Sequence, residues 1–509
     1  MKIKANYTSS EKWTLLATIL ASSLVFIDGT ALNIAMPALQ QDMNLSGPQL
    51  LWVVNAYTLF LSALLLIGGA MGDQYGRNRI FGIGLFLFML SSFFCGISAN
   101  SVQLITARVF QGIGGALLIP GSLSIITAQF SEEKTGGAIG LWSTFSALTA
   151  IIGPLLGGWL ADIGLWRIIF FINIPFSLIV LWVIFYRVAE SKNDETVRLD
   201  FVGAFLVMLG LAGITYGFIE SADKGFGAAI IIISLITGGL ASIGFIFSQH
   251  FVKHPMMPLK LFAITNFSTT NIATLLIYGA LSAITFFLPL NLVQVQGYSE
   301  MQAGLSMLPV ITLITILSSI SGRISDRIGA HLFLSVGPMI TGFGFFLFGF
   351  QGLTEGPSAY WKTFFMPAVL LGTGMGLTVA PLTTTVMLSV SKNNSGIASG
   401  VNNTVSRIAG VLSIALLGAL VLYYFRRNLI EQLNVLKIPE ELIKTLNKTA
   451  LNLGSTKIPE NTSPEMAGKI GFVIKTSFIK SFNIVACISA VAAWVSAIMC
   501  FALIKKRKV

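Results

Sequence analysis

Charged residues are scarce in this chain of 509 residues. Asp, Glu, Lys and Arg together make up 10% of it, whereas about 25% is usual for a soluble domain. Hydrophobic residues, by contrast, account for 54%. A soluble globule needs a charged coat, and this chain has too few charges to provide one. The composition therefore excludes a set of soluble domains and indicates an integral membrane protein.

Cysteine and histidine are also rare, with three residues of each. Cys95, Cys487 and Cys500 all lie inside apolar runs, which excludes a disulfide scaffold. His250 and His254 are four residues apart, but no acid or thiol stands nearby as a third ligand. The sequence therefore predicts no metal site, and no His, Cys and Asp cluster that would serve an enzyme.

Fourteen apolar runs are long enough to cross a bilayer as helices, which takes about 20 residues each. Their approximate extents are 13–36, 51–72, 79–98, 102–128, 137–161, 166–187, 200–220, 226–249, 266–292, 302–322, 331–351, 362–388, 397–425 and 480–504. No small-residue cleavage site interrupts the first run, so we interpret it as a span and not as a signal peptide. The prediction is an all-α integral membrane fold with 14 transmembrane helices.

Lys and Arg are distributed unevenly between the two sets of loops. The loops on the side of the termini hold 18 of them, whereas the short loops on the other side hold three. Basic residues stay on the cytoplasmic side, so we expect both termini to be cytoplasmic and the protein to lie in the cytoplasmic membrane. The net charge of +11 then reflects topology and anionic lipid, and a nucleic-acid partner is not expected.

A sequence repeat links the two halves of the chain. The turn after the second span contains Gly69, Asp73 and Gly76, and the same Gly, Asp and Gly recur 253 residues later around Asp326. Ser46 lies 27 residues before the first Asp, and a serine stands at the same distance before Asp326. Parallel halves of this kind are a transporter plan, with the substrate site between them near the midplane.

Aligning the halves pairs spans 1 to 6 with spans 9 to 14. We therefore expect an N-terminal six-helix bundle at 1–187, a linker with two additional transmembrane helices at 188–262, and a C-terminal six-helix bundle at 263–509. Residues 426–479 form a long extracellular loop in the last of these. Leucine and isoleucine recur in it at helical spacing, so it is either a folded cap that gates or docks a partner, or a surface excursion without function.

The repeated turn is a candidate cytoplasmic gate. Asp73 ends a helix at the membrane edge, Gly76 permits a tight turn, and Arg77 is able to reach carboxylates or helix ends nearby. Such a cluster latches two bundles in one state and releases them in the other. The predicted gate residues are Gly69, Asp73, Gly76, Arg77, Asp326 and Arg327.

Asp28 is the strongest candidate for chemistry. It lies about fifteen residues into the first span, and an ionisable residue inside a membrane is a functional candidate because burying it is costly unless it is paired or protonated. Arg108 in span 4 is the matching cation, and Gln111, Gly112 and Gly115 share its helix face. We expect Asp28 to carry the proton and Arg108 to set its affinity. The alternatives are an acid in contact with water at the external interface and a structural charge pair.

The fifth span contains Gly153, Pro154, Gly157 and Gly158. Proline removes a hydrogen-bond donor from the helix, and the glycines allow close packing and a bend. A passive kink is the alternative to a mechanistic one.

Several motifs together resemble those of the major facilitator superfamily, and specifically its fourteen-span drug:proton antiporter branch. They are Ile27-Asp28-Gly-Thr30-Ala-Leu-Asn33-Ile-Ala-Met-Pro37, the stretch from Gly69 to Arg79, Arg108-Val-Phe-Gln111-Gly112-Ile-Gly-Gly115-Ala116, Gly153-Pro154-Leu-Leu-Gly157-Gly158, and Trp166-Arg167 with Phe171-Ile-Asn173-Ile-Pro175. The resemblance runs from the first span to the last. It implies a major facilitator fold, and an antiport role for the kink at Gly153 and Pro154.

The resemblance and the residues together predict a proton-coupled exporter of lipophilic, cationic compounds that works by alternating access. It would use the proton gradient and no cofactor, since no phosphate-binding loop is present. Spans 302–322 and 397–425 contain no acid, which argues against doubly cationic substrates. Alternatives are a same-fold exporter of one dedicated lipid, peptide or siderophore, and a non-transporting receptor or scaffold. The sequence does not say whether a periplasmic adaptor docks.

Residues for substrate contact are chosen by polarity alone. Polar and aromatic side chains in the pore-forming spans either line an amphipathic cavity or make ordinary hydrogen bonds between helices. The candidates are Asn33, Tyr57, Gln111, Asn271 and Tyr278.

Overall fold

The computed structural model describes residues 7–192, 199–253, 255–391 and 394–504, without the side chains of Glu132, Ala147 and Asp326. All regular structure in these residues is helical. Fourteen of the described helical spans are long and apolar enough to cross a membrane. The predicted all-α fold with 14 transmembrane helices is therefore confirmed, and each span begins and ends close to its apolar run except at the last two.

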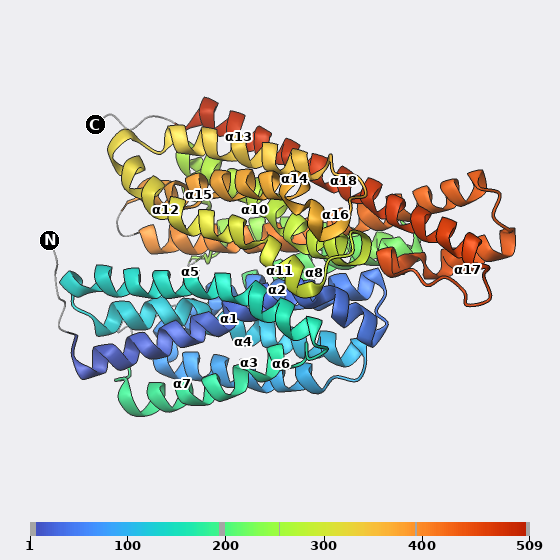
Figure 1. Ribbon diagram of the computed structural model, residues 1–509. Coiled ribbons are helices and arrows are strands. Elements are labelled where there is room, and N and C mark those ends of the chain that lie inside the picture. The colour runs from blue at the N-terminus through green and yellow to red at the C-terminus, as the bar shows by residue number, and fades with distance from the viewer. Residues whose placement is uncertain (1–6, 193–198, 254, 392–393, 505–509) are drawn as a thin grey trace.

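The first six spans form the N-terminal half of the bundle (Figure 1). They are α1 (Ser9–Met43), α2 (Gly47–Tyr75), α3 (Arg77–Ile97), α4 (Ser101–Gln129), α5 (Glu132–Asp162), and the pair α6 (Ile168–Phe171) and α7 (Asn173–Arg187). The sixth span is thus broken in its first turns, at Ile172. In this half α1 packs on α5 and α7, and α4 packs on α2 and α3.

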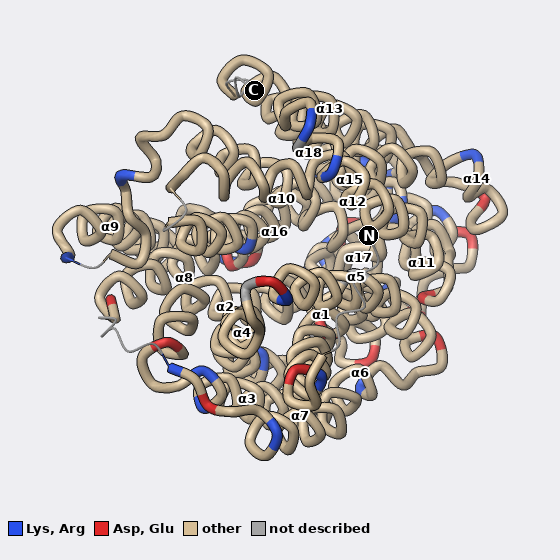
Figure 2. Tube along the Cα trace, turned by 90° about the vertical axis from the view of Figure 1, so that its left-hand side faces the viewer, with Lys and Arg blue, Asp and Glu red and all other residues tan. Residues whose placement is uncertain are grey.

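Two helices follow before the second half begins. They are α8 (Phe201–Lys224) and α9 (Ala229–Phe251), which pack on each other, while α8 also contacts α2. Viewed along the helices, the pair lies to one side of the two halves (Figure 2). A short 3-10 turn, Leu259–Ala263, leads from α9 into the next span.

The C-terminal half repeats the packing of the first. Its helices are α10 (Thr265–Leu290) with the π-helical turn Asn291–Val295, α11 (Glu300–Ser306) and α12 (Leu308–Ile328), α13 (His331–Phe348), the 3-10 turn Gly356–Ala359, α14 (Tyr360–Thr363) and α15 (Phe365–Leu388), α16 (Ser395–Val435), α17 (Glu440–Thr449) and α18 (Pro464–Leu503). Here α10 packs on α16 and α18, and α15 packs on α12 and α13. These are the partners that the pairing of spans 1 to 6 with 9 to 14 requires.

The repeat extends to the helix ends. Ser46 caps α2 and Ser299 caps α11, and each forms a capping box with a glutamine three residues later. The glycines that end α2 and α12, Gly76 and Gly329, both have positive φ, +106° and +90°. Because glycine tolerates that conformation at no steric cost, the same turn occurs in both halves. The shared sequence register therefore corresponds to shared structure.

Residues 426–479 fold as a helical cap at the end of the bundle opposite the termini (Figure 1). α16 continues through it to Val435 and α18 begins at Pro464, with α17 between them. Leu429 and Leu433 of α16 are fully buried, and Phe425 packs on Phe478 of α18. The predicted helical spacing is therefore confirmed, and the last two spans are longer than their apolar runs. We call this segment the cap and its end of the bundle the cap end.

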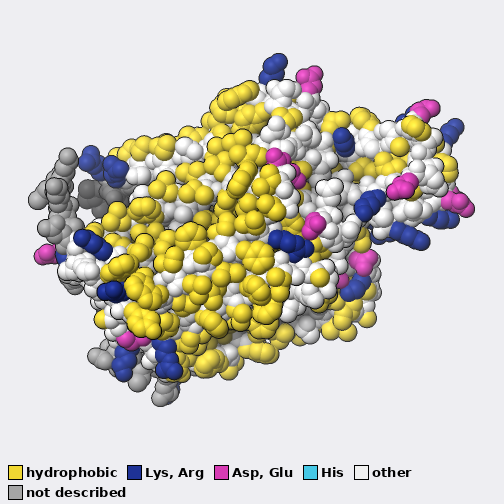
Figure 3. All heavy atoms as spheres, turned by 60° about the horizontal axis from the view of Figure 1, so that its bottom comes forward, with side chains coloured by type: hydrophobic (Ala, Val, Ile, Leu, Met, Phe, Trp, Pro, Cys, Tyr) yellow, Lys and Arg dark blue, Asp and Glu magenta, His cyan; other side chains and the backbone are white. Residues whose placement is uncertain are grey.

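The outer surface is apolar over most of the span length, as expected for helices that face lipid (Figure 3). Charged side chains gather at the two ends of the bundle (Figure 3). The end that holds the termini, called the termini end, carries ten of the 18 basic residues counted on that side. The other eight lie outside the described residues: Lys2, Lys4, Arg198, Lys392, Lys505, Lys506, Arg507 and Lys508.

Candidate functional site

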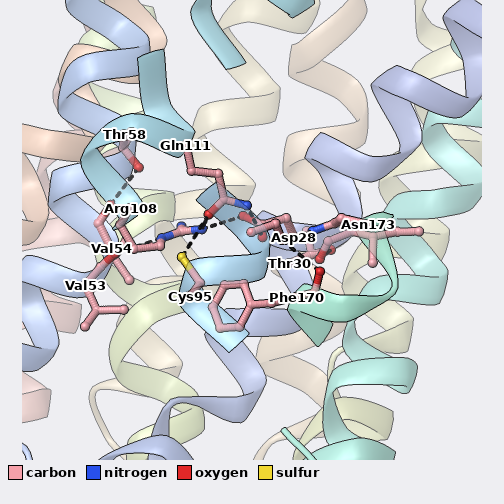
Figure 4. Close-up of polar contacts among 12 residues, drawn as sticks. Asp28, Thr30, Val53, Val54, Thr58, Cys95, Arg108, Gln111, Phe170 and Asn173 are labelled. Carbon is pink, nitrogen blue, oxygen red and sulfur yellow. Dashed lines mark hydrogen bonds and ion pairs between the residues drawn. The ribbon is translucent and has the colours of Figure 1, made fainter. Parts of the chain in front are cut away.

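Asp28 and Arg108 form an ion pair inside the N-terminal half (Figure 4). Nη1 of Arg108 lies 2.6 Å from Oδ2 of Asp28, so the pair joins α4 to α1. The side chain of Asp28 is fully buried and that of Arg108 is 2% exposed. The two ionisable residues that the sequence placed in the membrane are thus in direct contact and away from solvent.

Gln111 completes the coordination of the pair. Its Nε2 donates to Oδ1 of Asp28 at 2.9 Å, and its Oε1 accepts from Nη1 of Arg108 at 2.8 Å. The thiol of Cys95 in α3 donates to the same Oε1 at 3.6 Å. Both carboxylate oxygens therefore have a donor, and the amide cannot turn without losing bonds to both charges.

α2 supplies two further contacts to the guanidinium. Nε of Arg108 donates to the carbonyl oxygen of Val53 at 3.1 Å, and the guanidinium lies over the ring of Tyr57 at 4.2 Å. Gly112, one turn after Arg108, has no side chain where the carbonyl of Tyr57 comes closest. A Cβ there would overlap the α2 backbone, so the glycine lets α2 approach close enough to hold the arginine.

This arrangement makes the pair sensitive to protonation and to movement of the helices. The attraction within a buried ion pair offsets the cost of desolvation only while the two charges stay in contact. Removing one partner leaves the other charge uncompensated, at a cost of about 3–5 kcal/mol in stability. Protonation of Asp28 would likewise leave the charge of Arg108 uncompensated, unless the guanidinium bonded to another acceptor. A movement of α1 against α4 that lengthened the bond would break the same contact. The pair therefore links α1 to α4 through charge, and a proton-carrying role for Asp28 stays a prediction.

The residues of the predicted kink lie where α5 packs on α1 of its own half and on α11 of the other half. Gly157 approaches the backbone of Ala31 in α1, three residues after Asp28. On the opposite half, Gly158 faces the carbonyl of Glu300 in α11, and Gly304 faces the carbonyl of Pro154. The motif thus connects the helix of Asp28 to the C-terminal half. Gly153 lies against the side chain of Thr30.

The predicted gate at the termini end forms contacts inside the N-terminal half. Arg77 pairs with Asp73 at 2.9 Å, and Glu190 accepts from the backbone N–H groups of Asn78 and Arg79 at the start of α3. Gly69 packs against Pro120. On the other half, Arg327 is exposed at the end of α12 and the side chain of Asp326 lies outside the described residues. Among the described side chains, no bond links the two turns in this conformation, and a latch between them stays a prediction.

The predicted substrate residues are not gathered in one place. Gln111 and Tyr57 belong to the ion-pair cluster, and Asn271 is 3% exposed and accepts from Asn402 of α16 at 3.2 Å. Asn33 and Tyr278 are half-buried and make no hydrogen bond with a described residue. The structure therefore assigns Asn271 a bond between helices, and a contact with substrate stays a prediction for the set.

Side-chain hydrogen bonds between the two halves occur, within the described residues, at the cap end. Gln294, after α10, donates to Oε1 of Gln40 at 2.8 Å, and Gln40 donates to the carbonyl of Asn452 in the cap at 3.2 Å. Lys457 of the cap donates to Oδ1 of Asn44 at 2.7 Å. A cavity of about 410 Å³ lies in this seam. The cap thus bonds to the N-terminal half at the cap end.

Comparison with known families agrees with this geometry. The family model described as Major Facilitator Superfamily matches residues 18–414, well over half of the chain. The chain belongs to the major facilitator superfamily. The predicted resemblance is thereby confirmed at the level of the family, and the family consists of transporters.

Named relatives in this superfamily are resistance and export proteins. The chain is 32% identical to "Multidrug resistance protein Stp" of Mycobacterium tuberculosis, over 80% of this chain and 75% of the relative. It is 31% identical to "Cephamycin export protein CmcT" of Amycolatopsis lactamdurans, over 81% and 86%. It is also 28% identical to "Methylenomycin A resistance protein" of Bacillus subtilis, over 83% and 91%.

Solved structures support the fold. A bacterial homologue of the human lysosomal transporter Spinster, in an inward-facing and unoccupied conformation, superposes with a TM-score of 0.66 at 18% identity. The match covers 97% of this chain and 98% of that one. At this identity the likeness shows the fold alone, which is that of the superfamily.

Proposed function

We propose that this protein is a proton-coupled antiporter that exports lipophilic compounds from the cell by alternating access. The observation that carries the proposal is the buried Asp28–Arg108 pair, a titratable contact between α1 and α4 in a chain whose relatives are named for drug resistance and antibiotic export. A scaffold has no use for such a pair inside the membrane. The proton gradient would supply the energy, without a cofactor.

The distribution of basic residues supports an orientation with both termini in the cytoplasm of a cytoplasmic-membrane protein. The cap end, where Gln40 and Gln294 join the halves, then faces outward. In this orientation the hydrogen bonds between the halves lie on the outer side of the membrane. Outward release would require the bonds at the cap end to break.

The test is proton release from energised inverted vesicles, followed with a pH-sensitive dye. A panel of lipophilic cationic, neutral and anionic compounds is added to vesicles that contain the wild type or the Asp28→Asn variant. Dissipation of the gradient by several compounds with the wild type alone would support multidrug proton antiport. If no compound dissipates it although the protein is folded and inserted, the proposal fails, and export of one dedicated substrate becomes the leading explanation.

Cross-linking the cap end is expected to stop the cycle. Asn44→Cys and Lys457→Cys place two thiols where the cap bonds to α1, and a short bis-maleimide would tie the cap to the N-terminal half. We expect cross-linked protein to lose proton-linked export nearly completely, because the cap could no longer separate from α1. Export in the vesicle assay, before and after cross-linking, measures this.

A matched control is available within the cap itself. Arg426 donates to Asn447 at 2.6 Å, and both residues belong to the C-terminal half. Cross-linking Arg426→Cys to Asn447→Cys should leave export close to that of the untreated protein. Full export by the Asn44–Lys457 cross-linked protein would show that the cap end does not open there.

A further inference from the structure

Arg407 is a second arginine in the middle of a membrane span, and neither the predicted site nor the proton mechanism uses it. It stands twelve residues into α16, which at 1.5 Å per residue is about 18 Å from the start of the helix and near the middle of a bilayer core. Its side chain makes no hydrogen bond or ion pair with any described residue. A cation at that depth without a partner is costly and marks a functional position.

The position of Arg407 on its helix points it between the two halves. Gly400 and Gly418 of α16 face Leu66 and Leu51 of α2, and Arg407 lies on the same helical face between them. The exposed face of α16, with Leu416 at 42% and Tyr423 at 55%, is on the opposite side. Arg407 is half-buried, so its accessible part opens toward α2 and not toward lipid.

No acid in reach is free to neutralise this arginine. Asp28 already accepts from Arg108 and Gln111 through both of its oxygens. Glu220, near the cap end of α8, accepts from Trp52 and Lys224. Both of these acids are therefore taken, and among the described residues of the spans no acid is left to neutralise Arg407.

Tyr57 of α2 has a second unused donor. α2 packs on α16, and Tyr57 lies in the stretch of α2 between Leu51 and Leu66, which face Gly418 and Gly400 on either side of Arg407. Its ring packs on the guanidinium of Arg108, and its hydroxyl is buried without a hydrogen-bond partner among the described residues. Buried hydroxyl groups almost always have a partner. Thr404, one turn before Arg407, has a buried hydroxyl oxygen that is also unpaired.

We propose that Arg407 and the hydroxyl of Tyr57 bind a carboxylate of the exported compound. The inference rests on the proposed export function and changes its substrate class from cations to lipophilic compounds that carry an anionic group. A guanidinium presents two parallel N–H groups that match a carboxylate, and the tyrosine O–H adds a third donor. Asp28 remains the proposed proton site, so the anionic group of the substrate and the proton would be bound by different residues.

The test uses two dyes that differ only in the proposed group. Rhodamine B carries a free carboxylate, and its ethyl ester has the same cationic ring system without it. Binding of each dye to purified full-length protein is measured by fluorescence polarisation for the wild type, Arg407→Gln, Arg407→Lys and Tyr57→Phe. The readout is the ratio of the two affinities, which cancels losses that affect both dyes equally.

We expect the wild type to bind the acid about 10-fold or more tightly than the ester, since a charge-assisted hydrogen bond supports a difference of that size. Arg407→Gln should bring the ratio close to one, Tyr57→Phe should lower it several-fold, and Arg407→Lys should keep part of it. Arg427→Gln, an exposed arginine on the same helix, should leave the ratio unchanged.

Three results would overturn the proposal. The first is that the wild type binds acid and ester equally, or does not bind the acid. The second is that Arg407→Gln still prefers the acid, and the third is that the wild type in nanodiscs loses its preference for the acid when phosphatidylglycerol is added. The last would assign the cation to a lipid phosphate. Because binding is measured without a gradient, failure of proton-linked export in vesicles is seen separately and counts against the proposed function alone.

Discussion

Replacing Asp28 with Asn is expected to reduce proton-linked export to background while the protein still reaches the membrane. Asn keeps the shape of the side chain and a hydrogen-bond acceptor for Arg108, but it cannot bind or release a proton. Compound-induced proton release in inverted vesicles measures the loss. Asp42→Asn is the matched control, because Asp42 lies on the same helix with a side chain that is 53% exposed at the cap end.

Stability separates a coupling role for this pair from a structural one. Asp28→Asn leaves the buried Arg108 charge uncompensated, so we expect a lower thermal unfolding temperature. The double variant Asp28→Asn/Arg108→Gln removes both charges and should recover part of that stability without recovering export. A double variant that regains proton-linked export would show that the pair is structural. Full export by Asp28→Asn would remove Asp28 from the proton pathway.

The fold was predictable because a bilayer imposes a simple rule on the sequence. A membrane span needs a long apolar run, and the fourteen runs therefore located fourteen spans. The rule does not apply outside the membrane, where α16 extends ten residues beyond its apolar run to Val435. There the helix is held by packing of Leu429 and Leu433, with Phe425 against Phe478. The helical spacing of leucines indicated that the cap is folded. It did not indicate that α16 and α18 continue into the cap.

The candidate site was predictable only in its charged side chains. Asp28 and Arg108 stand out in apolar helices, so their pairing follows from the cost of leaving either alone. Nε of Arg108 donates to the backbone carbonyl of Val53. Every residue has such a carbonyl, so the sequence does not indicate which one accepts this bond. Tyr57 was a candidate for substrate contact by polarity alone, and polarity does not indicate that its ring lies on the guanidinium of Arg108.

Arg407 is visible in the sequence as an ionisable residue inside span 13. The sequence does not show whether a nearby acid is free to pair with Arg407. Only the coordinates show that both oxygens of Asp28 are occupied. Whether Arg407 needs an anion from a substrate therefore depends on the hydrogen bonds of residues that are distant from it in the chain.

Gly157→Val is expected to abolish export through the packing of α5 on α1. A Cβ at Gly157 would overlap the backbone of Ala31, and backbone cannot move aside as a flexible side chain does. The added bulk would push α1 away from α5, and overpacking of this kind costs about 1–3 kcal/mol. Because Asp28 is three residues from Ala31, the displacement would also change the contact with Arg108. We expect at least a 10-fold loss of proton-linked export.

Gly140→Val tests whether this loss comes from the close approach and not from valine in α5. Gly140 lies on the same helix, and a Cβ there would meet no atom within 4 Å, so this variant should export at close to the wild-type rate. Gly157→Ala adds the smallest side chain that has a Cβ and should be intermediate. Equal export by Gly157→Val and Gly140→Val would show that the close packing of α5 on α1 is not needed for export. Protonation would then have to be coupled to the C-terminal half through helices other than α5.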